Sequence, residues 1–230
     1  MLVIGGGAAG MIAAIRAAEL GANVTIIEKN EKLGKKLYIT GKGRCNLTNT
    51  ASREEFFANI RDNPKFLMSA FSAFNNMDII ELLESYNVPM TVERGGRVFP
   101  QSGKSSDIIS AFKRQIEKLD IKVLYNTKVI DIQKNNAGYT VYTNSGKYTD
   151  KAVIIATGGV SYIATGSTGD GYVFAKKLGH SIVETKASLI GLLTDNTSKM
   201  SGLTLKNVAV EAVADGKIVA KDFGELLYTH

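Results

Sequence analysis

Two periods of apolar and polar residues occur along the chain, one typical of buried strands and one of helices. Apolar runs at Leu2–Ile4 and at residues 24–27 enclose a stretch with helical spacing, so residues 1–28 predict a strand, a helix and a second strand. Strand-like segments recur at residues 122–125, 128–133, 139–143 and 153–156, and Asn- and Gly-rich turns separate the middle ones. The opening unit predicts an α/β protein with a parallel sheet. The middle strands have the form of a β-meander, although periodicity alone does not show that a meander is inserted into that sheet.

The middle of the chain has helical periodicity. From residue 53 to residue 86 the spacing predicts two or three helices, with starts at Asn63-Pro64 and at Asp78. Ser105 or Ser106 is expected to cap a further helix. Its apolar residues form one stripe, which is expected to face the core: Ile108, Ile109, Phe112, Ile116 and Leu119.

From Ser188 onward the apolar segments become short and strand-like. Residues 207–214 and 217–221, joined by Asp215-Gly216, predict a hairpin. We expect a first domain over residues 1–187, with a helical segment at residues 53–118, and the beginning of a β-rich second domain over residues 188–230. Because few strands precede His230 to cover its edges, this second domain is expected to be incomplete.

Three glycines follow the first strand at a spacing suited to a dinucleotide. Gly5 permits a tight turn, Gly7 lets main-chain amides approach a pyrophosphate, and Gly10 lets the helix pack close to the strand. The positive end of that helix favours the anion. Glu28 ends the second strand, where its carboxylate is expected to accept hydrogen bonds from an adenosine ribose and to repel a 2′-phosphate. The alternative is a glycine turn in an ordinary βα unit.

Two later stretches are also rich in glycine. The apolar run at residues 152–156 is expected to be a strand covered on both faces, and it ends in Thr157-Gly158-Gly159, where ligands collect at the carboxyl ends of parallel strands. Residues 165–171 precede a helix-like segment. There, either Asp170 caps the helix or its glycine neighbours, Gly169 among them, expose main-chain amides to a ligand.

The charge and composition of the chain narrow the classes of ligand that it is expected to bind. The 28 basic and 22 acidic residues give a net charge of +6, which is mild for 230 residues and does not demand nucleic acid. Basic residues gather between Lys29 and Arg44: Lys32, Lys35, Lys36 and Lys42. Either this is a solvated basic loop, or some of these charges face phosphates of a cofactor.

Few residues could ligate a metal or form a disulfide. Cys45 is the single cysteine, and the two histidines lie far apart, so we expect no metal and no disulfide within the chain. The apolar start lacks a basic flank, and no segment is long enough to span a bilayer. We therefore expect a cytoplasmic protein with no membrane partner.

Six motifs together resemble one bacterial flavoprotein family. They are GGGAAG, GKKLYITGKGRCNLTN, ERGGRVFPQSGKS, ATGGVSY, TGSTGDGY and GELLYTH. The chain is similar, over nearly its whole length, to the aminoacetone oxidase-like group, which includes bile-acid-inducible flavoproteins and other NAD(P)/FAD-dependent oxidoreductases. The resemblance implies a Rossmann-like, two-dinucleotide-type FAD-binding domain that is interrupted by a β-rich second domain.

The resemblance also implies roles for particular residues. The pyrophosphate would be lined by Gly5, Gly7, Ala8, Ala9 and Gly10. Glu28 would hold the ribose, Lys36 would lie along the pyrophosphate, and Val129 would place its backbone at the adenine. With Lys36, the loop at residues 41–46 would lie along the pyrophosphate and toward the flavin ring, through Gly41, Gly43, Arg44, Cys45 and Asn46. The cofactor would be covered by Ala156, Thr157 and Gly158, and Lys29, Gly169 and Asp170 complete the candidate set.

The expected function is FAD-dependent two-electron oxidation or reduction of a small organic substrate. Oxygen is slightly preferred to NAD(P)H as the redox partner, because a second glycine fingerprint is missing. No catalytic residue stands out, and Cys45 fits packing better than catalysis. Relatives often have proline at Ile163 and continue beyond His230, so part of the FAD site is expected to be absent. The alternative is a non-catalytic flavin- or nucleotide-binding fragment.

Overall fold

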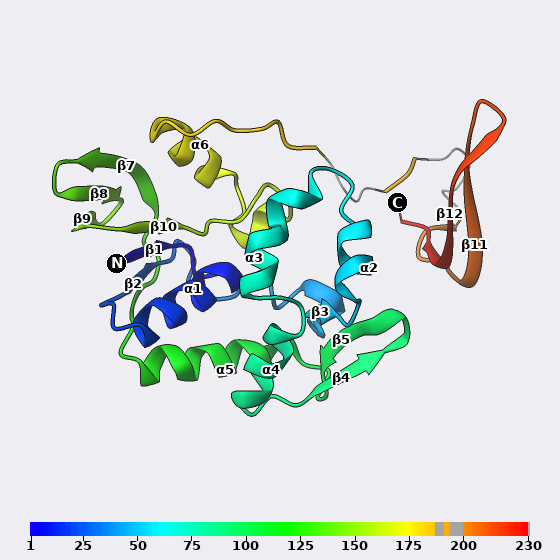
Figure 1. The fold of residues 1–230 in the computed structure, drawn as a ribbon, viewed down its shortest axis with the longest axis horizontal. Helices are drawn as coiled ribbons and strands as arrows, with labels where there is room; N and C mark the ends of the chain where they lie inside the picture. Colours follow the sequence, from blue (N-terminus) through cyan, green and yellow to red (C-terminus); the bar gives the residue numbers. More distant parts are fainter. Residues whose placement is uncertain (187–190, 194–199, 230) are drawn as a thin grey trace. The chain divides into compact units, whose positions relative to one another are not determined.

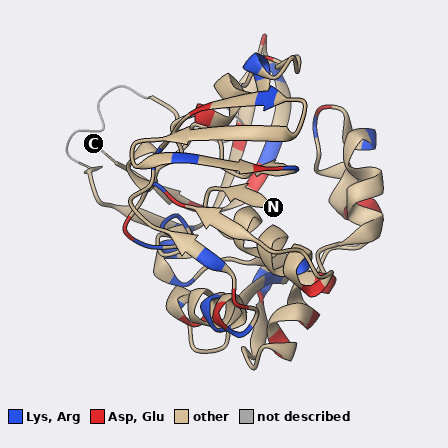
Figure 2. Ribbon diagram, turned by 90° about the vertical axis from the view of Figure 1, so that its left-hand side faces the viewer, with Lys and Arg blue, Asp and Glu red and all other residues tan. Residues whose placement is uncertain are grey.

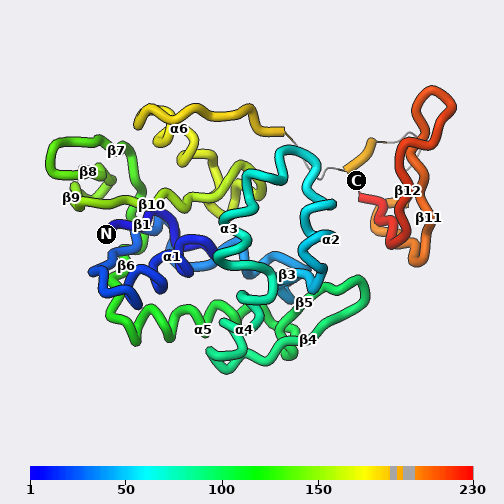
Figure 3. Tube along the Cα trace, viewed as in Figure 1, coloured from blue at the N-terminus to red at the C-terminus, as the bar shows by residue number. Residues whose placement is uncertain are grey.

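The computed structural model describes residues 1–186, 191–193 and 200–229. The chain forms two compact units, Met1–Ile182 and Val183–His230, and each is described by itself. The boundary expected at residues 187 and 188 lies outside the described residues. Figure 1 shows the ribbon and Figure 3 the path of the chain.

The first unit is built on a four-stranded parallel sheet. In spatial order the strands are β10 (Val153–Ile155), β1 (Leu2–Ile4), β2 (Thr25–Ile27) and β6 (Lys122–Leu124). Leu2 lies opposite Val153 on one side and opposite Thr25 on the other. The α/β class and the parallel sheet are therefore confirmed, and each of these strands lies within one or two residues of its predicted bounds.

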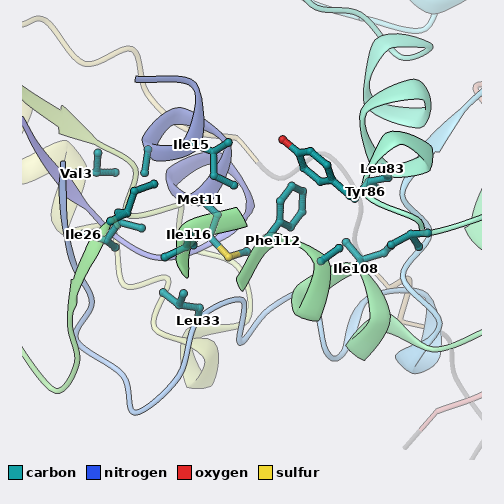
Figure 4. Close-up of a cluster of buried hydrophobic side chains, with 14 of the residues drawn as sticks. Val3, Met11, Ile15, Ile26, Leu33, Leu83, Tyr86, Ile108, Phe112 and Ile116 are labelled. Carbon is teal, nitrogen blue, oxygen red and sulfur yellow. The ribbon is translucent and has the colours of Figure 1, made fainter. Parts of the chain in front are cut away.

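Helices cover one face of this sheet. Both α1 (Ala8–Glu19) and α5 (Ser105–Lys118) lie on this side and contact each other (Figure 1). Val3 and Ile26 point toward them and pack in a cluster with Met11 and Phe112 (Figure 4). Four of the five residues of the predicted stripe on α5 are buried, which confirms that the stripe faces the core.

The meander and a helix cover the opposite face. The meander has the order β7 (Val129–Asn135), β8 (Gly138–Thr143) and β9 (Gly146–Asp150), and the helix is α6 (Asp170–Lys177). Leu2 and Ile4 pack here against Ile132, Val141 and Phe174. Because alternate residues of each short strand enter opposite clusters, both faces must be apolar, as the strand sequences are. Strand β9 was not predicted.

The segment between β2 and α5 forms short helices and a small antiparallel sheet. The helices are α2 (Arg53–Ala58), α3 (Met68–Ala73) and α4 (Asp78–Ser85), and the sheet order is β3 (Thr48–Asn49), β5 (Arg97–Pro100), β4 (Met90–Glu93). Helical turns begin at Pro64 and at Asp78 as predicted. The predicted serine cap of α5 is wrong: Lys104 is the N-cap residue, and the hydroxyl of Ser105 donates instead to the carbonyl of Tyr38.

The second unit contains the predicted hairpin, with longer strands than expected. It pairs β11 (Thr204–Ala214) with β12 (Lys217–Leu227). Asp215 and Gly216 have φ angles of 50° and 74°, as a tight turn between twisted strands requires. Among the described residues, no helix has the length and apolar character needed to cross a membrane.

Candidate functional site

A cavity of about 660 Å³ lies at the carboxyl ends of β10, β1 and β2. Its position follows from the strand order, because the chain leaves β1 through α1 to reach β2 on one side, whereas β10 lies on the other side of β1. Parallel sheets bind ligands at such a switch point. The volume is within the range of about 300–1,000 Å³ that is usual for small-molecule and cofactor sites.

The turn after β1 requires glycine at two positions. Gly5 has a φ angle of 103°, and a Cβ there would lie 2.5 Å from the carbonyl oxygen of Ala156. A Cβ on Gly10 would overlap the carbonyl oxygen of Gly5. Gly10 is not among the residues that line the cavity, and its missing Cβ allows α1 to approach the turn, which is the packing role expected of the third glycine.

Gly7 forms an open cradle at the start of α1. It is the N-cap residue, no side chain caps the helix, and the first turn holds no acidic residue. A Cβ at Gly7 would meet no atom within 4 Å, and its φ of −79° suits any residue. Free space, uncapped amides and the positive helix end together fit an anionic group such as a diphosphate.

Glu28 closes the cavity where β2 ends, and only 5% of it is exposed. Its Oε2 accepts a hydrogen bond from the amide of Gly6 at 2.6 Å, and its Oε1 accepts from the amide and the side chain of Asn30, both at 2.7 Å. A carboxylate offers about four acceptor positions, so one remains on Oε2. The side chain is thus held firmly beside the glycine turn.

Asp170 and Lys29 join α6 to the end of β2. The Lys29 ammonium lies 2.8 Å from a carboxylate oxygen of Asp170 and 2.7 Å from the hydroxyl oxygen of Thr168. Burial raises the pKa of Asp170, but hydrogen bonds from Lys29 and Thr168 and the charges of Lys29 and Lys128 outweigh it, so this pKa lies below its ordinary value. Asp170 does not cap α6, because Gly169 is the N-cap residue and no side chain caps the helix.

The basic residues at positions 29–44 have different surroundings. Lys36 lines the cavity and donates to the carbonyl of Ser161 at 2.8 Å. Lys35 also lines the cavity but pairs with Glu31 of its own segment. Lys32 lies over the ring of Tyr38. The segment is therefore neither a wholly solvated loop nor a uniform row of charges around the cavity.

Arg44 and Cys45 belong to a loop that turns away from the cavity. Arg44 pairs with Glu93 and lies 4.2 Å from the centre of the Phe99 ring. Cys45 is 1% exposed and packs in the same core cluster as Met11. Burial raises the pKa of its thiol, and a hydrogen bond with Thr40 opposes this shift only in part. The surroundings of Cys45 are those of a packing residue.

The structure gathers most of the candidate residues around the cavity. They are Gly5, Gly7, Ala8, Ala9, Glu28, Lys29, Lys36, Val129, Ala156, Thr157, Gly158 and Asp170. The lining does not include Gly10, Gly41, Gly43, Arg44, Cys45, Asn46 and Gly169, whose roles toward a cofactor stay predictions.

Sequence reasoning missed some lining residues, among them Gly6, Asn30, Thr165, Gly166 and Ser167. Gly6 lies in the motif GGGAAG, and Thr165, Gly166 and Ser167 lie in TGSTGDGY, so these motifs could have indicated them. No feature of the sequence indicates Asn30. Among the described residues, no group of three or more His, Cys, Asp and Glu side chains is placed to hold a metal ion.

Fold and site together define a dinucleotide-binding protein of the Rossmann class. A family model described as "HI0933-like protein Rossmann domain" matches residues 1–228, and the chain belongs to this family. The family binds FAD, and the open cradle at Gly7 with the carboxylate of Glu28 fits that cofactor.

Two curated relatives are similar over the whole chain. The chain is 29% identical to a 3-dehydro-bile acid delta(4,6)-reductase of Clostridium scindens, with 99% of this chain and 56% of the relative covered. It is 30% identical to a ribosomal RNA dihydrouridine synthase of Haemophilus influenzae, with 100% and 57% covered. The chain thus spans somewhat more than half the length of these relatives.

Solved structures support the fold. The open conformation of a flavocytochrome c3 fumarate reductase matches with a TM-score of 0.55 and 24% identity, covering 78% of this chain and 40% of that one. At this identity the likeness concerns the arrangement of sheet and helices.

Proposed function

We propose that this chain forms the cofactor-binding part of an FAD-dependent oxidoreductase. The observation that carries the proposal is the cavity in which the uncapped start of α1 at Gly7 lies beside the fixed carboxylate of Glu28. FAD, when bound, supplies two-electron transfer, and the protein supplies binding and orientation.

Each part of the cavity has a proposed task. The amides at the start of α1 bind the diphosphate, and the remaining acceptor position on Glu28 Oε2 receives a ribose hydroxyl. Val129 lies beside the adenine, and Lys36 beside the diphosphate. The turn at Ala156 and Gly158 borders the rest of the cofactor. The identification of these residues with these tasks is supported by their common position in the lining.

The proposed substrate is a small organic molecule, with oxygen or NAD(P)H as redox partner. Aminoacetone oxidase-like chemistry is one form of this proposal, supported by the six sequence motifs. The named relatives act on different substrate classes, a dehydro-bile acid and ribosomal RNA. Because this chain is about equally identical to both relatives, the comparison supports an oxidoreductase in general and favours neither substrate. We propose no nucleic-acid or membrane partner, and a cytoplasmic location.

Reduction of a uridine in ribosomal RNA is a second candidate, favoured by the name of the Haemophilus relative. In the first unit, Lys and Arg are interspersed with Asp and Glu along the ribbon (Figure 2). Nucleic-acid surfaces more often gather basic residues on one face. Incubating the FAD-loaded protein with unmodified ribosomal RNA and NADPH, followed by nucleoside mass analysis, tests this candidate: new dihydrouridine would favour it over a small-molecule substrate.

The central experiment identifies the nucleotide that the purified chain carries. The protein is denatured, and the released small molecules are identified by mass after incubation with excess FAD and desalting. We expect FAD at close to one equivalent, with NADP not retained under the same treatment. A protein that retains no FAD contradicts the proposal. Retention of FAD without turnover of any donor or acceptor would instead favour the non-catalytic binding fragment.

A further inference from the structure

We propose that residues 159–169, here called the strap, close the cavity over the bound cofactor, and that Lys29, Asn30 and Lys36 hold the strap shut and so slow cofactor release. The inference rests on the proposed function, since it assigns to that same site a device for retention. Figure 3 shows the strap as part of the connection between β10 and α6.

The strap and the turn that is proposed to bind the diphosphate both line the cavity at the carboxyl end of the sheet. The strap begins just after β10, and its contacts lie on residues just after β2. In the sheet, β1 lies between these two strands. The strap thus joins the carboxyl ends of the two strands that flank β1, and the carboxyl end of β1 leads into the glycine turn at residues 5–7. Thr165, Gly166 and Ser167 of the strap line the cavity accordingly.

The strap is a closed loop with its own internal hydrogen bonds. The amide of Gly169 donates to the carbonyl of Gly159 at 3.1 Å and so joins its two ends. Inside it, the amide of Thr165 donates to the carbonyl of Tyr162 at 2.9 Å. Gly158, just before the strap, and Gly169, its last residue, have φ angles of 75° and 80°, which glycine adopts without strain. Such a loop can move as a unit about its ends.

Three side chains from one short segment hold the strap. Lys29 donates to the hydroxyl of Thr168 at 2.7 Å and pairs with Asp170, just beyond the strap. The side chain of Asn30 donates to the carbonyl of Thr165 at 3.3 Å. Lys36 donates to the carbonyl of Ser161 at 2.8 Å. The contacts are spread along the strap, so together they fix its whole length.

Packing at the contact is close, whereas the outer side of the strap is open. A Cβ on Gly166 would lie 2.7 Å from the side-chain Nδ2 of Asn30 and 3.1 Å from the Cε of Lys29. By contrast, Val160, Tyr162 and Ile163 are 52%, 72% and 65% exposed. Since little apolar surface of the strap is buried, the polar contacts provide most of its attachment. Breaking them would free the strap without disturbing the core.

The first test measures FAD release. Lys29→Gln removes the contacts to Thr168 and Asp170, and Lys35→Gln is the matched control, since Lys35 has the same charge, lines the same cavity and pairs with Glu31 instead. Release is followed by the rise in flavin fluorescence after strong dilution of the FAD-loaded protein into buffer, so that released FAD does not bind again. We expect Lys29→Gln to release FAD about tenfold faster than wild type, which corresponds to loss of one modest interaction, and Lys35→Gln less than about twofold faster.

A second test separates strap opening from direct contact of Lys29 with the cofactor. Hydrogen exchange is measured on the apoprotein, where no flavin is present, over peptides that span residues 159–169. We expect faster exchange in Lys29→Gln and in Asp170→Asn, no further increase in the double variant because both changes break one contact, and wild-type exchange in Lys35→Gln.

The outcomes separate the strap from the proposed function. If hydrogen exchange of residues 159–169 is unchanged in both Lys29→Gln and Asp170→Asn, these contacts do not hold the strap and the inference is wrong, even if the variants release FAD faster. If Lys29→Gln and Lys35→Gln release FAD at the same rate while the wild type retains FAD, the inference about the strap is also wrong. The proposed function is not affected by that result. A wild-type protein that binds no FAD contradicts the proposed function itself.

Discussion

The carboxylate of Glu28 accepts a hydrogen bond from the main-chain amide of Gly6 at 2.6 Å. This bond connects the end of β2 to the turn that follows β1, twenty-two residues earlier in the chain. The acid that sequence reasoning assigned to a ligand therefore also supports the loop on which the ligand would lie. A change at Glu28 must affect both folding and binding.

Replacing Glu28 with Gln is expected to destabilise the protein by about 1–3 kcal/mol, because the buried carboxylate accepts from donors at both of its oxygens. A glutamine amide turns one end into a donor, which then faces either the amide of Gly6 or that of Asn30. Urea unfolding of the apoprotein measures the loss. The exposed pair Glu31 and Lys35 provides a control, since Glu31→Gln is expected to leave the unfolding midpoint in urea almost unchanged. Equal costs for the two variants would contradict this account.

Gly7→Asp is expected to separate stability from cofactor binding. Asp is a favourable N-cap residue, the space around Gly7 is open, and its backbone is already in the extended region, so thermal stability should stay the same or rise. The new carboxylate would, however, stand where the diphosphate is proposed to bind. We expect FAD affinity to fall about 100-fold or more, measured by fluorescence titration.

Gly7→Ser is the matched control for this prediction, because serine caps the helix without adding charge. We expect its FAD affinity to fall by less than about tenfold. If both variants bind FAD equally well, the anion does not lie at the start of α1.

Local pattern was sufficient to predict the parts of the site that depend on short-range geometry. Gly5 and Gly10 are required by contacts with Ala156 and with each other, and a glycine spacing expresses such steric demands directly. The apolar strands were predictable because each is buried on both faces. The position of the cavity then follows from strand order.

Long-range side-chain contacts were not predictable in the same way. Asn30 reaches Thr165, a partner distant in the chain, and no local pattern marks an asparagine for that contact. Residues 41–46 fold through left-handed φ angles at Gly41, Lys42 and Cys45, which carry the cysteine into the core. A glycine-rich sequence indicates such freedom but not the direction in which the chain turns.

The contribution of the Lys29–Asp170 pair to stability should depend on pH. The folded pKa of Asp170 lies below the ordinary value of 3.8, so the charged form is favoured in the folded state. Stability from the pair is therefore fully present above about pH 5 and is lost as the pH falls through the lowered pKa.

The measurement compares wild type with Asp170→Asn in urea at several pH values. We expect a difference of up to about 1 kcal/mol that is constant between about pH 7 and pH 5, as for a partly exposed pair, and that shrinks below the ordinary pKa of aspartate. A difference that persists unchanged at about pH 2.5 would show that the ion pair is not its source.

The hydroxyl of Tyr86 is buried and has no hydrogen-bond partner among the described residues, so it is expected to lower the stability of the folded protein. Its ring packs edge-on against Phe112 at 6.4 Å, and burial together with the negative charge of Glu19 raises the pKa of the hydroxyl. Tyr86→Phe keeps the ring contact and removes the unsatisfied group. We expect thermal stability to rise by about 2–4 °C, the equivalent of about 1 kcal/mol.

The control for this variant is Tyr142→Phe, since Tyr142 is 37% exposed and its hydroxyl is close to Gln133. We expect a change within about 0.5 kcal/mol. A loss of stability in Tyr86→Phe larger than that of the control would mean that the hydroxyl is bonded in solution.

Cys45 should be chemically inert in the folded protein. It is 1% exposed, and burial raises the pKa of its thiol, so both access and thiolate formation are suppressed. We expect iodoacetamide at about pH 8 to modify the native thiol at least about 100-fold more slowly than the thiol in urea. Since the chain has a single cysteine, incorporation by intact mass reports this residue alone. Native and unfolded rates within about tenfold of each other would place the thiol in contact with solvent and return it to consideration as a reactive group.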